Sequence, residues 1–409
     1  MFSEVPEGWS LKRFGEIASV KNGFAFKSKD FVESNSCVAA VVRMSDLKNG
    51  TVEAGLARKI PLDCVQGLEK FRLEIGDFVF GMSGSLSNYA VVPATSFPLY
   101  LNQRVGKLEA KDADASFLRF LYTSDDFMRL VEKSASGNAQ LNISGKQIES
   151  FEVIVPPLNE QHRIAEILSS VDASIQATQA VIDQAERVKR GLMEELLTGG
   201  LGSETIERGE VPEGWQFAEL KDCLTKVIDY RGKAPPKASN GVPLITAKNI
   251  RKGFLSFADA EYIDAEQYKN WMVKGLPRAG DILFTTEAPL GNVAMFPIEG
   301  LFALGQRTIT LRCNKRLEST YLFYLLQSKL VEAELQLRAT GTTAKGIKSK
   351  EFQKIKVLFP SIAEQIHIAK ILASFDESMG KQKTILEQQT RLKKGLMDDL
   401  LTGKVRTIS

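Results

Sequence analysis

The chain has 409 residues, of which 44% are apolar and 25% charged, as in a soluble globular protein with room for two or more domains. No apolar run reaches the roughly 18 residues that a membrane-spanning helix needs, and the first residues lack the features of a signal peptide. The four cysteines are far apart and form no C-x-x-C pair. We therefore expect reduced thiols in a cytoplasmic protein that contacts no membrane.

The net charge of +3 says little about partners, but the basic residues are unevenly distributed. Seven basic residues stand against one acid between Lys226 and Lys252, and six against one between Arg338 and Lys356. Such clusters are typical of an electropositive groove, although a solvated basic surface gives the same pattern.

The sequence contains an internal duplication. VPEGW occurs at 5–9 and at 211–215, and KRGLMEELLTG at 189–199 returns as KKGLMDDLLTG at 393–403. Aligned without a gap, 156–199 and 360–403 share 20 identities in 44 positions. The intervening parts match more loosely in the same order. The repeat predicts domains at 1–157 and 201–360, each followed by a repeated segment, at 158–200 and 361–409.

The globular domains are predicted to be mixed α/β. Short strands are expected at VAAVVRMS, DFVFGMS and YAVVPA in the first domain, and at VPLITA, DILFTT and TITLRC in the second. Amphipathic helices are expected over Phe117–Val131 and Tyr321–Leu337.

The repeated segments are predicted to be long helices with a heptad seam. Prolines precede both, Ser361 and Glu364 fit a capping box, and Gly199 and Gly403 suit C-terminal caps. The first seam is Ile164, Leu168, Val171, Ile175, Ile182, Ala185, Leu192 and Leu196, interrupted by Thr178 and Lys189. The second is Ile368, Leu372, Phe375, Met379, Leu386, Leu396 and Leu400, interrupted by Gln382, Gln389 and Lys393.

Connectivity predicts how these helices pair. About 40 residues make a rod of ~60 Å, and the roughly 12 residues after the first helix reach at most ~40 Å. The second helix should therefore run back beside the first as an antiparallel coiled coil, relating two similar halves by a pseudo-two-fold axis. The same geometry brings the C-terminal tail near the N-terminus.

At this point the pattern resembles the specificity subunits of type I restriction-modification systems. The paired PEGW openings, the helix starts PPLNEQHRIAEIL and PSIAEQIHIAKIL, and the paired GLMEELLTG and GLMDDLLTG ends carry the resemblance over nearly the whole chain. It implies two target-recognition domains that each read one part of a split double-stranded DNA site. It also implies a helical spacer that docks two methyltransferase subunits, with restriction and translocation subunits in the same complex.

No catalytic constellation is found in the sequence. It contains no G-x-x-x-x-G-K-[ST] loop and no Asn/Asp-Pro-Pro-aromatic string. His162 and His367 fit helix surfaces, and Asp77 and Asp281 fit turns. We therefore expect a non-enzymatic chain without metal or cofactor, whose partner subunits would use S-adenosylmethionine, ATP and Mg²⁺.

Polar and basic loops supply the candidate DNA contacts, because groove edges and phosphates are bound by such side chains. Gln103-Arg104 and Gln306-Arg307 recur, and a shared pair suits scaffold or phosphate contact better than base choice. In the first half the candidates are Arg43, Ser45, Lys48, Ser85, Asn88, Tyr89, Arg104, Asn138, Gln140, Asn142 and Lys146. In the second they are Tyr230, Arg231, Lys233, Lys237, Lys248, Asn249, Arg251, Thr286, Asn292, Arg307, Thr343, Lys345, Lys348 and Lys350.

The outward faces of the helices are the candidate partner surface. Recurring polar, Met and Arg positions are preferred, since Met and Arg are enriched at interfaces. They are Gln161, Arg187, Met193, Gln365, Arg391 and Met397.

Three other interpretations stay open from the sequence. The chain could be the recognition subunit of a type IIB-like system, in which one partner chain both methylates and cleaves. A two-headed protein adaptor would explain the duplication but not the paired basic loops. A stand-alone enzyme is disfavoured by the missing motifs.

Overall fold

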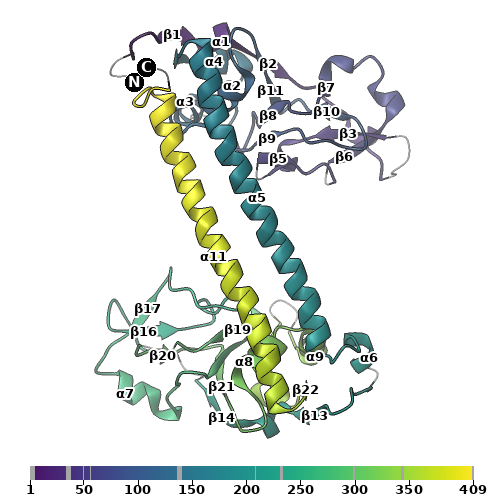
Figure 1. The fold of residues 1–409 in the computed structure, drawn as a ribbon, viewed down its shortest axis with the longest axis vertical. Helices are drawn as coiled ribbons and strands as arrows, with labels where there is room; N and C mark the ends of the chain where they lie inside the picture. Colours follow the sequence, from purple (N-terminus) through teal and green to yellow (C-terminus); the bar gives the residue numbers. More distant parts are fainter. Residues whose placement is uncertain are drawn as a thin grey trace. The chain divides into compact units, whose positions relative to one another are not determined.

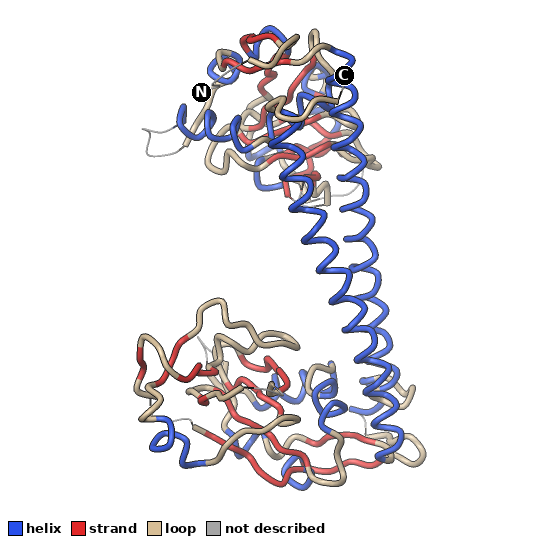
Figure 2. The backbone as a smooth tube through the Cα atoms, turned by 60° about the vertical axis from the view of Figure 1, so that its left-hand side comes forward, coloured by secondary structure: helices blue, strands red, loops and turns tan. Residues whose placement is uncertain are grey.

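The computed structural model describes residues 5–33, 38–48, 50–55, 57–135, 141–207, 209–230, 234–297, 300–341 and 345–407. The chain divides into two compact units (Figures 1 and 2). Unit 1 comprises Met1–Gln179 and Ile385–Ser409, and unit 2 comprises Ala180–Thr384. Two long helices, α5 (Leu158–Leu196) and α11 (Ile362–Leu401), each contribute one part to unit 1 and the other part to unit 2.

The globular part of unit 1 is built on two larger sheets and a short antiparallel strand pair, β1–β12. The sheet orders are β6-β3-β10-β7 and β2-β11-β8-β9-β5-β4. The strands are β1 (Ser10–Arg13), β2 (Ala18–Asn22), β3 (Val38–Val42), β4 (Leu47–Lys48), β5 (Gly50–Val52), β6 (Arg58–Pro61), β7 (Arg72–Leu73), β8 (Phe78–Gly81), β9 (Tyr89–Val91), β10 (Leu99–Leu101), β11 (Val105–Ala110) and β12 (Glu152–Val155). The helices are α1 (Phe14–Ile17), α2 (Ala115–Thr123), α3 (Asp125–Ala135) and α4 (Gly145–Glu149).

Unit 2 repeats this plan with the orders β13-β22, β14-β21-β18-β19 and β15-β17-β16-β20. Its strands are β13 (Gln216–Glu219), β14 (Leu224–Asp229), β15 (Lys237–Ala238), β16 (Val242–Ile245), β17 (Glu261–Ile263), β18 (Ile282–Thr286), β19 (Leu290–Met295), β20 (Ala303–Leu304), β21 (Thr308–Cys313) and β22 (Lys356–Phe359). Its shorter helices are α6 (Ser203–Glu207), α7 (Tyr268–Trp271), α8 (Ser319–Leu325), α9 (Lys329–Arg338) and α10 (Ser349–Phe352).

Strand order and direction confirm that the two domains share one fold. The sequence β2-β11-β8-β9 corresponds to β14-β21-β18-β19, and the parallel pair β3–β10 corresponds to the parallel pair β16–β20. The six predicted strands are found as β3, β8, β9, β16, β18 and β21. Central strands such as β3 and β18 are buried along their whole length, which explains their unbroken apolar runs.

The predicted helices over Phe117–Val131 and Tyr321–Leu337 are wrong as single helices, because each breaks at a serine. Ser124 and Ser328 have extended backbones, and each hydroxyl accepts a hydrogen bond from the N–H three residues later. A serine in this conformation caps a new helix. The apolar periodicity continues across each break, so the sequence pattern alone does not reveal the break.

The predicted long helices are confirmed as α5 and α11, and their ends follow the predicted signals. The Ser361 hydroxyl accepts the N–H of Glu364 at the start of α11. Gly199 and Gly403 follow the helices with φ of +60° and +71°. A Cβ at Gly199 would lie 2.7 Å from Pro212 Cγ, and one at Gly403 would lie 2.5 Å from Pro6 Cγ, so both sites require glycine.

Within each unit the two long helices run antiparallel, as predicted. In unit 1, Gln389 Nε2 donates to Ser174 Oγ at 2.8 Å, and Lys393 Nζ lies 2.6 Å from Asp172. In unit 2, Lys383 pairs with Glu186, and Lys189 pairs with Asp376. Residue numbers thus rise along one helix as they fall along the other.

The two lysines that interrupt the seam form the same contact in both units. Lys393 pairs with Asp172 and lies over the Phe120 ring, whereas Lys189 pairs with Asp376 and lies over the Tyr324 ring. These residues occupy equivalent positions of the repeat. In unit 2 the Tyr324 hydroxyl also donates to Asp376 at 2.8 Å, and burial raises the pKa of Tyr324. We call this Lys–Asp–aromatic arrangement the seam cluster.

The C-terminal tail folds back onto the N-terminal segment, as predicted from connectivity. The Arg406 guanidinium donates to both oxygens of buried Glu160 at 2.8 Å, and it also donates to the Glu7 carbonyl. Trp9 Nε1 donates to the same carboxylate at 2.9 Å. These contacts, the bond from Arg406 first, lower the pKa of Glu160.

Removing one aspartate of a seam cluster should destabilise the chain. Asp172→Ala leaves Lys393 without its acid, and also Arg119, which lies 3.6 Å from the same carboxylate. For a half-buried pair we expect a loss of about 1–3 kcal/mol in the free energy of unfolding, measured in urea. Glu377→Ala, which breaks an exposed pair with Lys381, serves as control and should leave the free energy of unfolding almost unchanged. Equal effects from both variants would contradict the assignment.

The Glu160 contacts should make stability depend on pH. Because the folded pKa is depressed, the stabilisation is fully present above the unfolded value of about 4.3 and is lost as the pH falls through the folded pKa. At pH 7 Glu160→Gln should lower the free energy of unfolding by about 1–3 kcal/mol, and the difference from wild type should shrink below pH 4. Glu364→Gln, at the exposed repeat counterpart, should show neither effect in the same melts.

Candidate nucleic-acid interface

Hydrogen bonds to backbone groups bring four loops of unit 1 to one place. The Asn88 side-chain amide donates to the Met44 carbonyl, joining the loop after β3 to the β8–β9 turn. Met82 N–H donates to the Arg104 carbonyl, and Ile143 N–H donates to the Met82 carbonyl. The loops at 43–48, 82–89, 102–104 and 141–146 therefore form one continuous surface, which we call loop cluster 1.

Unit 2 joins its loops in a corresponding way. Asn292 Nδ2 donates to the Ile250 carbonyl at 2.8 Å. Thr286 N–H donates to the Arg307 carbonyl, and Ile347 N–H donates to the Thr286 carbonyl, as Met82 and Ile143 do in unit 1. The loops at 246–253, 286–292, 305–307 and 345–350 form loop cluster 2. A shared backbone scaffold thus presents side chains that differ between the two units.

Several predicted contacts in loop cluster 1 are exposed, but some are held by acids. Arg43 forms a two-pronged pair with Asp46, whose side chain is 2% exposed, and exposed Lys48 pairs with Glu53 at 3.1 Å. Ser45, Ser85 and Asn142 are exposed, and Tyr89 is half-buried beside Phe78. Arg104 and Lys146 are exposed and pair with no acid of the described chain.

In unit 2 three lysines that pair with no acid of the described chain line one groove. Lys226, Lys348 and Lys350 line it together with Lys221, and within the described ranges none of the first three pairs with an acid. Arg251 is exposed as well. Lys237 and Lys248 both approach Glu261, Arg307 pairs with Glu287, and Lys345 donates to Gln336. Lys226 was not among the predicted site residues, although its place in the basic run 226–252 was a usable signal.

Three predicted DNA contacts have buried side chains, so the structure does not present them to a ligand. Asn249 is 2% exposed, and its amide caps the turn by accepting Thr246 N–H and donating to the Ser256 carbonyl. Thr286 is 1% exposed and donates to the Arg307 carbonyl. Tyr230 is 3% exposed and exchanges hydrogen bonds with the Gly275 backbone, and burial raises its pKa.

Two further predicted base readers have a structural role. Asn88 and Asn292 each commit the amide nitrogen to the bond that joins neighbouring loops. They are equivalent in the repeat, so their recurrence could have indicated scaffold from the sequence. Five predicted contacts lie outside the described residues: Asn138, Gln140, Arg231, Lys233 and Thr343.

On the helices, the prediction that Gln161 and Gln365 face outward is wrong. They are 2% and 0% exposed, and each binds its own globular domain. Gln161 accepts Asp114 N–H and donates to the Pro156 carbonyl, and Gln365 does the same with Glu318 and Pro360. Arg187 and Arg391 are exposed, while Met193 and Met397 are half-buried.

The residues set aside as non-catalytic have structural contacts. Asp77 and Asp281 accept backbone N–H groups in their turns and pair with Lys107 and Arg312.

Among the described residues no group of three or more His, Cys, Asp or Glu could hold a metal ion. No helix in the described part of the chain is both long and apolar enough to span a bilayer.

Comparison with known proteins identifies the family. The family model described as "Type I restriction modification DNA specificity domain" matches residues 6–187 and 212–389, and the chain belongs to this family. The protein named MjaX specificity subunit, from Methanocaldococcus jannaschii, is 27% identical over 424 residues, or 98% of this chain and 95% of that one. The type I restriction enzyme EcoBI specificity subunit of Escherichia coli is 23% identical over 403 residues, or 92% and 82%.

Solved structures show the same fold. The type I S subunit from M. genitalium superposes with a TM-score of 0.60 at 14% identity, covering 97% of this chain and 96% of that one. A chain from a study of complex assembly in a type I restriction-modification system gives 0.51 at 20% identity, covering 98% and 100%. The two-domain architecture with repeated helices is thus the architecture of this family.

Removing the shared cations of loop cluster 1 should weaken binding to DNA of any sequence. For Arg104→Ala with Lys146→Ala we expect the slope of log K against log salt to flatten by about 2, because two phosphate contacts are lost. Fluorescence anisotropy with duplexes of unrelated sequence measures this. Lys381→Ala with Lys383→Ala removes two charges from α11 and should leave the slope unchanged. The same slope in both double variants would contradict the assignment.

Proposed function

We propose that this chain selects the DNA sequence for a type I restriction-modification complex and carries no catalytic group itself. Loop cluster 1 reads one half of a split site, and loop cluster 2 reads the other. One observation carries the proposal: the backbone bonds that join the loops recur in both units, whereas the exposed side chains on them differ. Position 45 is serine and its counterpart is Lys248; Ser85 corresponds to Pro289, and Asn142 to Gly346.

Side chains that recur in the two clusters suit phosphate contact, because the two halves share a DNA backbone but not a base sequence. Arg104 corresponds to Arg307, and Lys146 to Lys350. The differing positions suit base contact in the grooves. Two recognition domains with different exposed side chains imply an asymmetric bipartite DNA site.

The helices supply the second part of the proposal. The pair α5 and α11 sets the gap between the two half-sites and docks two methyltransferase subunits, with restriction and translocation subunits joining through the complex. S-adenosylmethionine, ATP and Mg²⁺ would act in those partner chains, in the cytoplasm. Arg187, Arg391 and the half-buried Met193 and Met397 are the candidate docking residues.

A type IIB-like system would use the same recognition chain with a single partner that both methylates and cleaves. The loop clusters suit both systems equally. Co-purification distinguishes them, since only the type I system requires a separate ATP-driven subunit.

Methylome mapping of the source strain with and without this gene tests the function. We expect deletion to remove one split, asymmetric adenine-methylation motif while other motifs persist. Replacing Ser85 and Asn142 by other residues should change only one half of that motif. Each lost two-pronged base contact should cost about 1–3 kcal/mol of DNA-binding free energy. An unchanged methylome after deletion would refute the proposal.

A further inference from the structure

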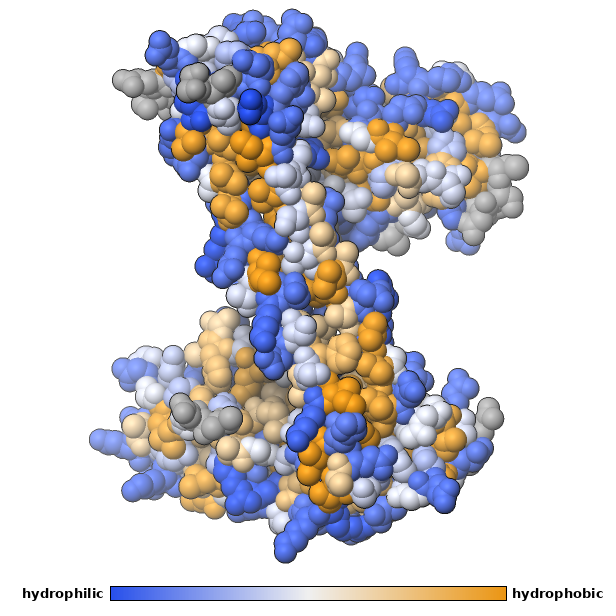
Figure 3. Space-filling view, in the orientation of Figure 1, coloured by the Kyte–Doolittle hydropathy of each residue, from blue (hydrophilic) through white to orange (hydrophobic). Residues whose placement is uncertain are grey.

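Unit 1 contains a cavity of about 540 Å³ between α3, β12 and the last turns of α11. Its floor is apolar and includes Leu121, Phe127, Ile154, Met397 and Leu401. Figure 3 shows apolar surface beside the C-terminal end of α11. The floor belongs to the core of the unit, but the cavity opens to solvent.

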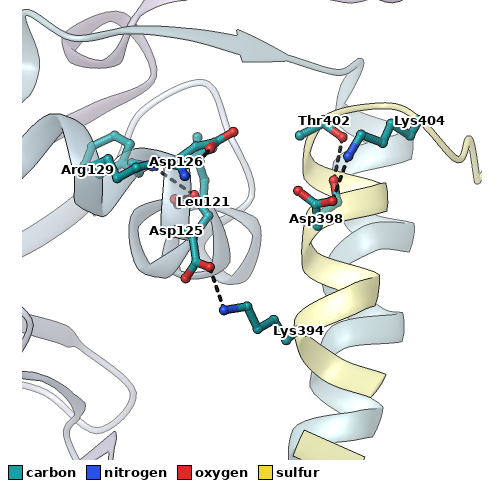
Figure 4. Close-up of polar contacts among 10 residues, drawn as sticks. Leu121, Asp125, Asp126, Arg129, Lys394, Asp398, Thr402 and Lys404 are labelled. Carbon is teal, nitrogen blue, oxygen red and sulfur yellow. Dashed lines mark hydrogen bonds and ion pairs between the residues drawn. The ribbon is translucent and has the colours of Figure 1, made fainter. Parts of the chain in front are cut away.

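Charged residues surround the opening, and they pair with one another (Figure 4). Lys394 on α11 lies 2.9 Å from Asp125 on α3, Arg129 pairs with Asp126, and Lys404 lies 2.7 Å from Asp398. The Lys394 and Asp125 side chains are 74% and 69% exposed, so their pair closes the opening only weakly. The rim is thus neutral, and the apolar floor is the part that favours binding.

The repeat shows what covers the equivalent surface in unit 2. There α6 lies over α9 and β22, and its Ile206 is 2% exposed. Ile206 packs against Leu330 and Leu358 in a small apolar cluster. Leu358 is the counterpart of Ile154 on the cavity floor, and Leu330 is the counterpart of Asp126 on its rim.

No described residue of unit 1 takes the place of Ile206. After Gly403 the chain turns away, and Arg406 binds Glu160 and the Glu7 carbonyl. Leu11 on β1, which pairs with Ile154, is 51% exposed, whereas its counterpart Phe217 packs against the Ile206 cluster. The surface that α6 covers in unit 2 is thus uncovered among the described residues of unit 1.

We propose that this cavity is a docking site for a short helical segment of a partner protein, which inserts one large aliphatic side chain as α6 inserts Ile206. The partner is identified through the proposed function, as the methyltransferase subunit that assembles with this chain. Met397 then contributes to docking from inside the cavity, which accounts for its half-buried position. In unit 2 the chain's own α6 already covers the corresponding surface.

An intramolecular competitor tests both parts of the proposal. A copy of residues 200–210 is appended after Ser409 of the full chain, and a matched control carries the same copy with aspartate at the position copied from Ile206. A tethered segment reaches a high effective concentration at a nearby site, so weak affinity suffices. The readouts are the melting temperature and the Kd for the methyltransferase subunit by calorimetry.

We expect the isoleucine tail to raise the melting temperature above that of the aspartate tail, because a segment that binds the folded state stabilises it. We also expect it to weaken binding of the methyltransferase subunit at least tenfold, while the aspartate tail leaves the Kd unchanged. Asp126→Leu, which copies Leu330, should enlarge the stabilisation by the isoleucine tail.

Equal melting temperatures for the two tails, in wild type and in Asp126→Leu, would overturn the assignment of the cavity as a docking site. The same result is expected if the chain's own undescribed residues fill the cavity, and it overturns the assignment in that case too. If the isoleucine tail raises the melting temperature but leaves the Kd of the methyltransferase subunit unchanged, that subunit docks elsewhere. This result would overturn the identification of the partner. If the methyltransferase subunit binds none of the chains, the proposed function fails, while the melting temperatures still decide whether the cavity accepts the side chain.

Discussion

In both units, one lysine of a long helix pairs with an aspartate of the other helix and lies over an aromatic ring of the globular domain. Lys393 and Lys189 are the charged residues of a seam that is mainly apolar, and a charge there is tolerated because an acid pairs with it. Such polar positions fix register, since a slip of either helix would leave the cation unpaired in a half-buried site. Phe120 and Tyr324 extend the contact to α2 and α8, so the same cluster also fixes each globular domain on its helices.

The buried glutamines extend this attachment. Gln161 and Gln365 join the first turn of each long helix to the loop before α2 or α8, at equivalent positions of the repeat. Helix register and the attachment of each globular domain to its helices are therefore fixed by a few polar contacts that recur in both units. The loop clusters can then change their exposed side chains freely, because Asn88, Asn292 and the backbone bonds keep the loops joined. This division between scaffold and surface suits a family in which each head must read a different sequence.

Much of the fold could be predicted because the duplication supplied internal comparisons. The repeat showed the domain plan, and the heptad pattern with Gly199 and Gly403 predicted α5 and α11 closely. The breaks at Ser124 and Ser328 could not be seen in apolar periodicity, because both sides of each break bury the same face. The positions of these breaks depend on tertiary contacts rather than on the local sequence pattern.

The candidate site was harder to predict, since composition does not tell a polar side chain that binds a partner from one that binds its own backbone. Asn249 and Thr286 have the composition of base readers, yet a turn and a strand end use them internally. Recurrence was the useful signal, because Asn88, Asn292, Gln161 and Gln365 are shared and all serve the scaffold. The cavity beside Met397 had no sequence signature; only comparison of the two folded units revealed it.

The central claim is that α5 and α11 together set the gap between two DNA half-sites. Its most direct test inserts one heptad into each helix, after Gln179 and after Thr384, where the division between the units leaves the contacts within each intact. Seven residues lengthen a helix by ~10 Å, which corresponds to about three base pairs. The account predicts that methylation at the native motif is lost and that any remaining methylation falls on the same half-sites with a changed gap. Undiminished methylation at the native spacing would contradict it.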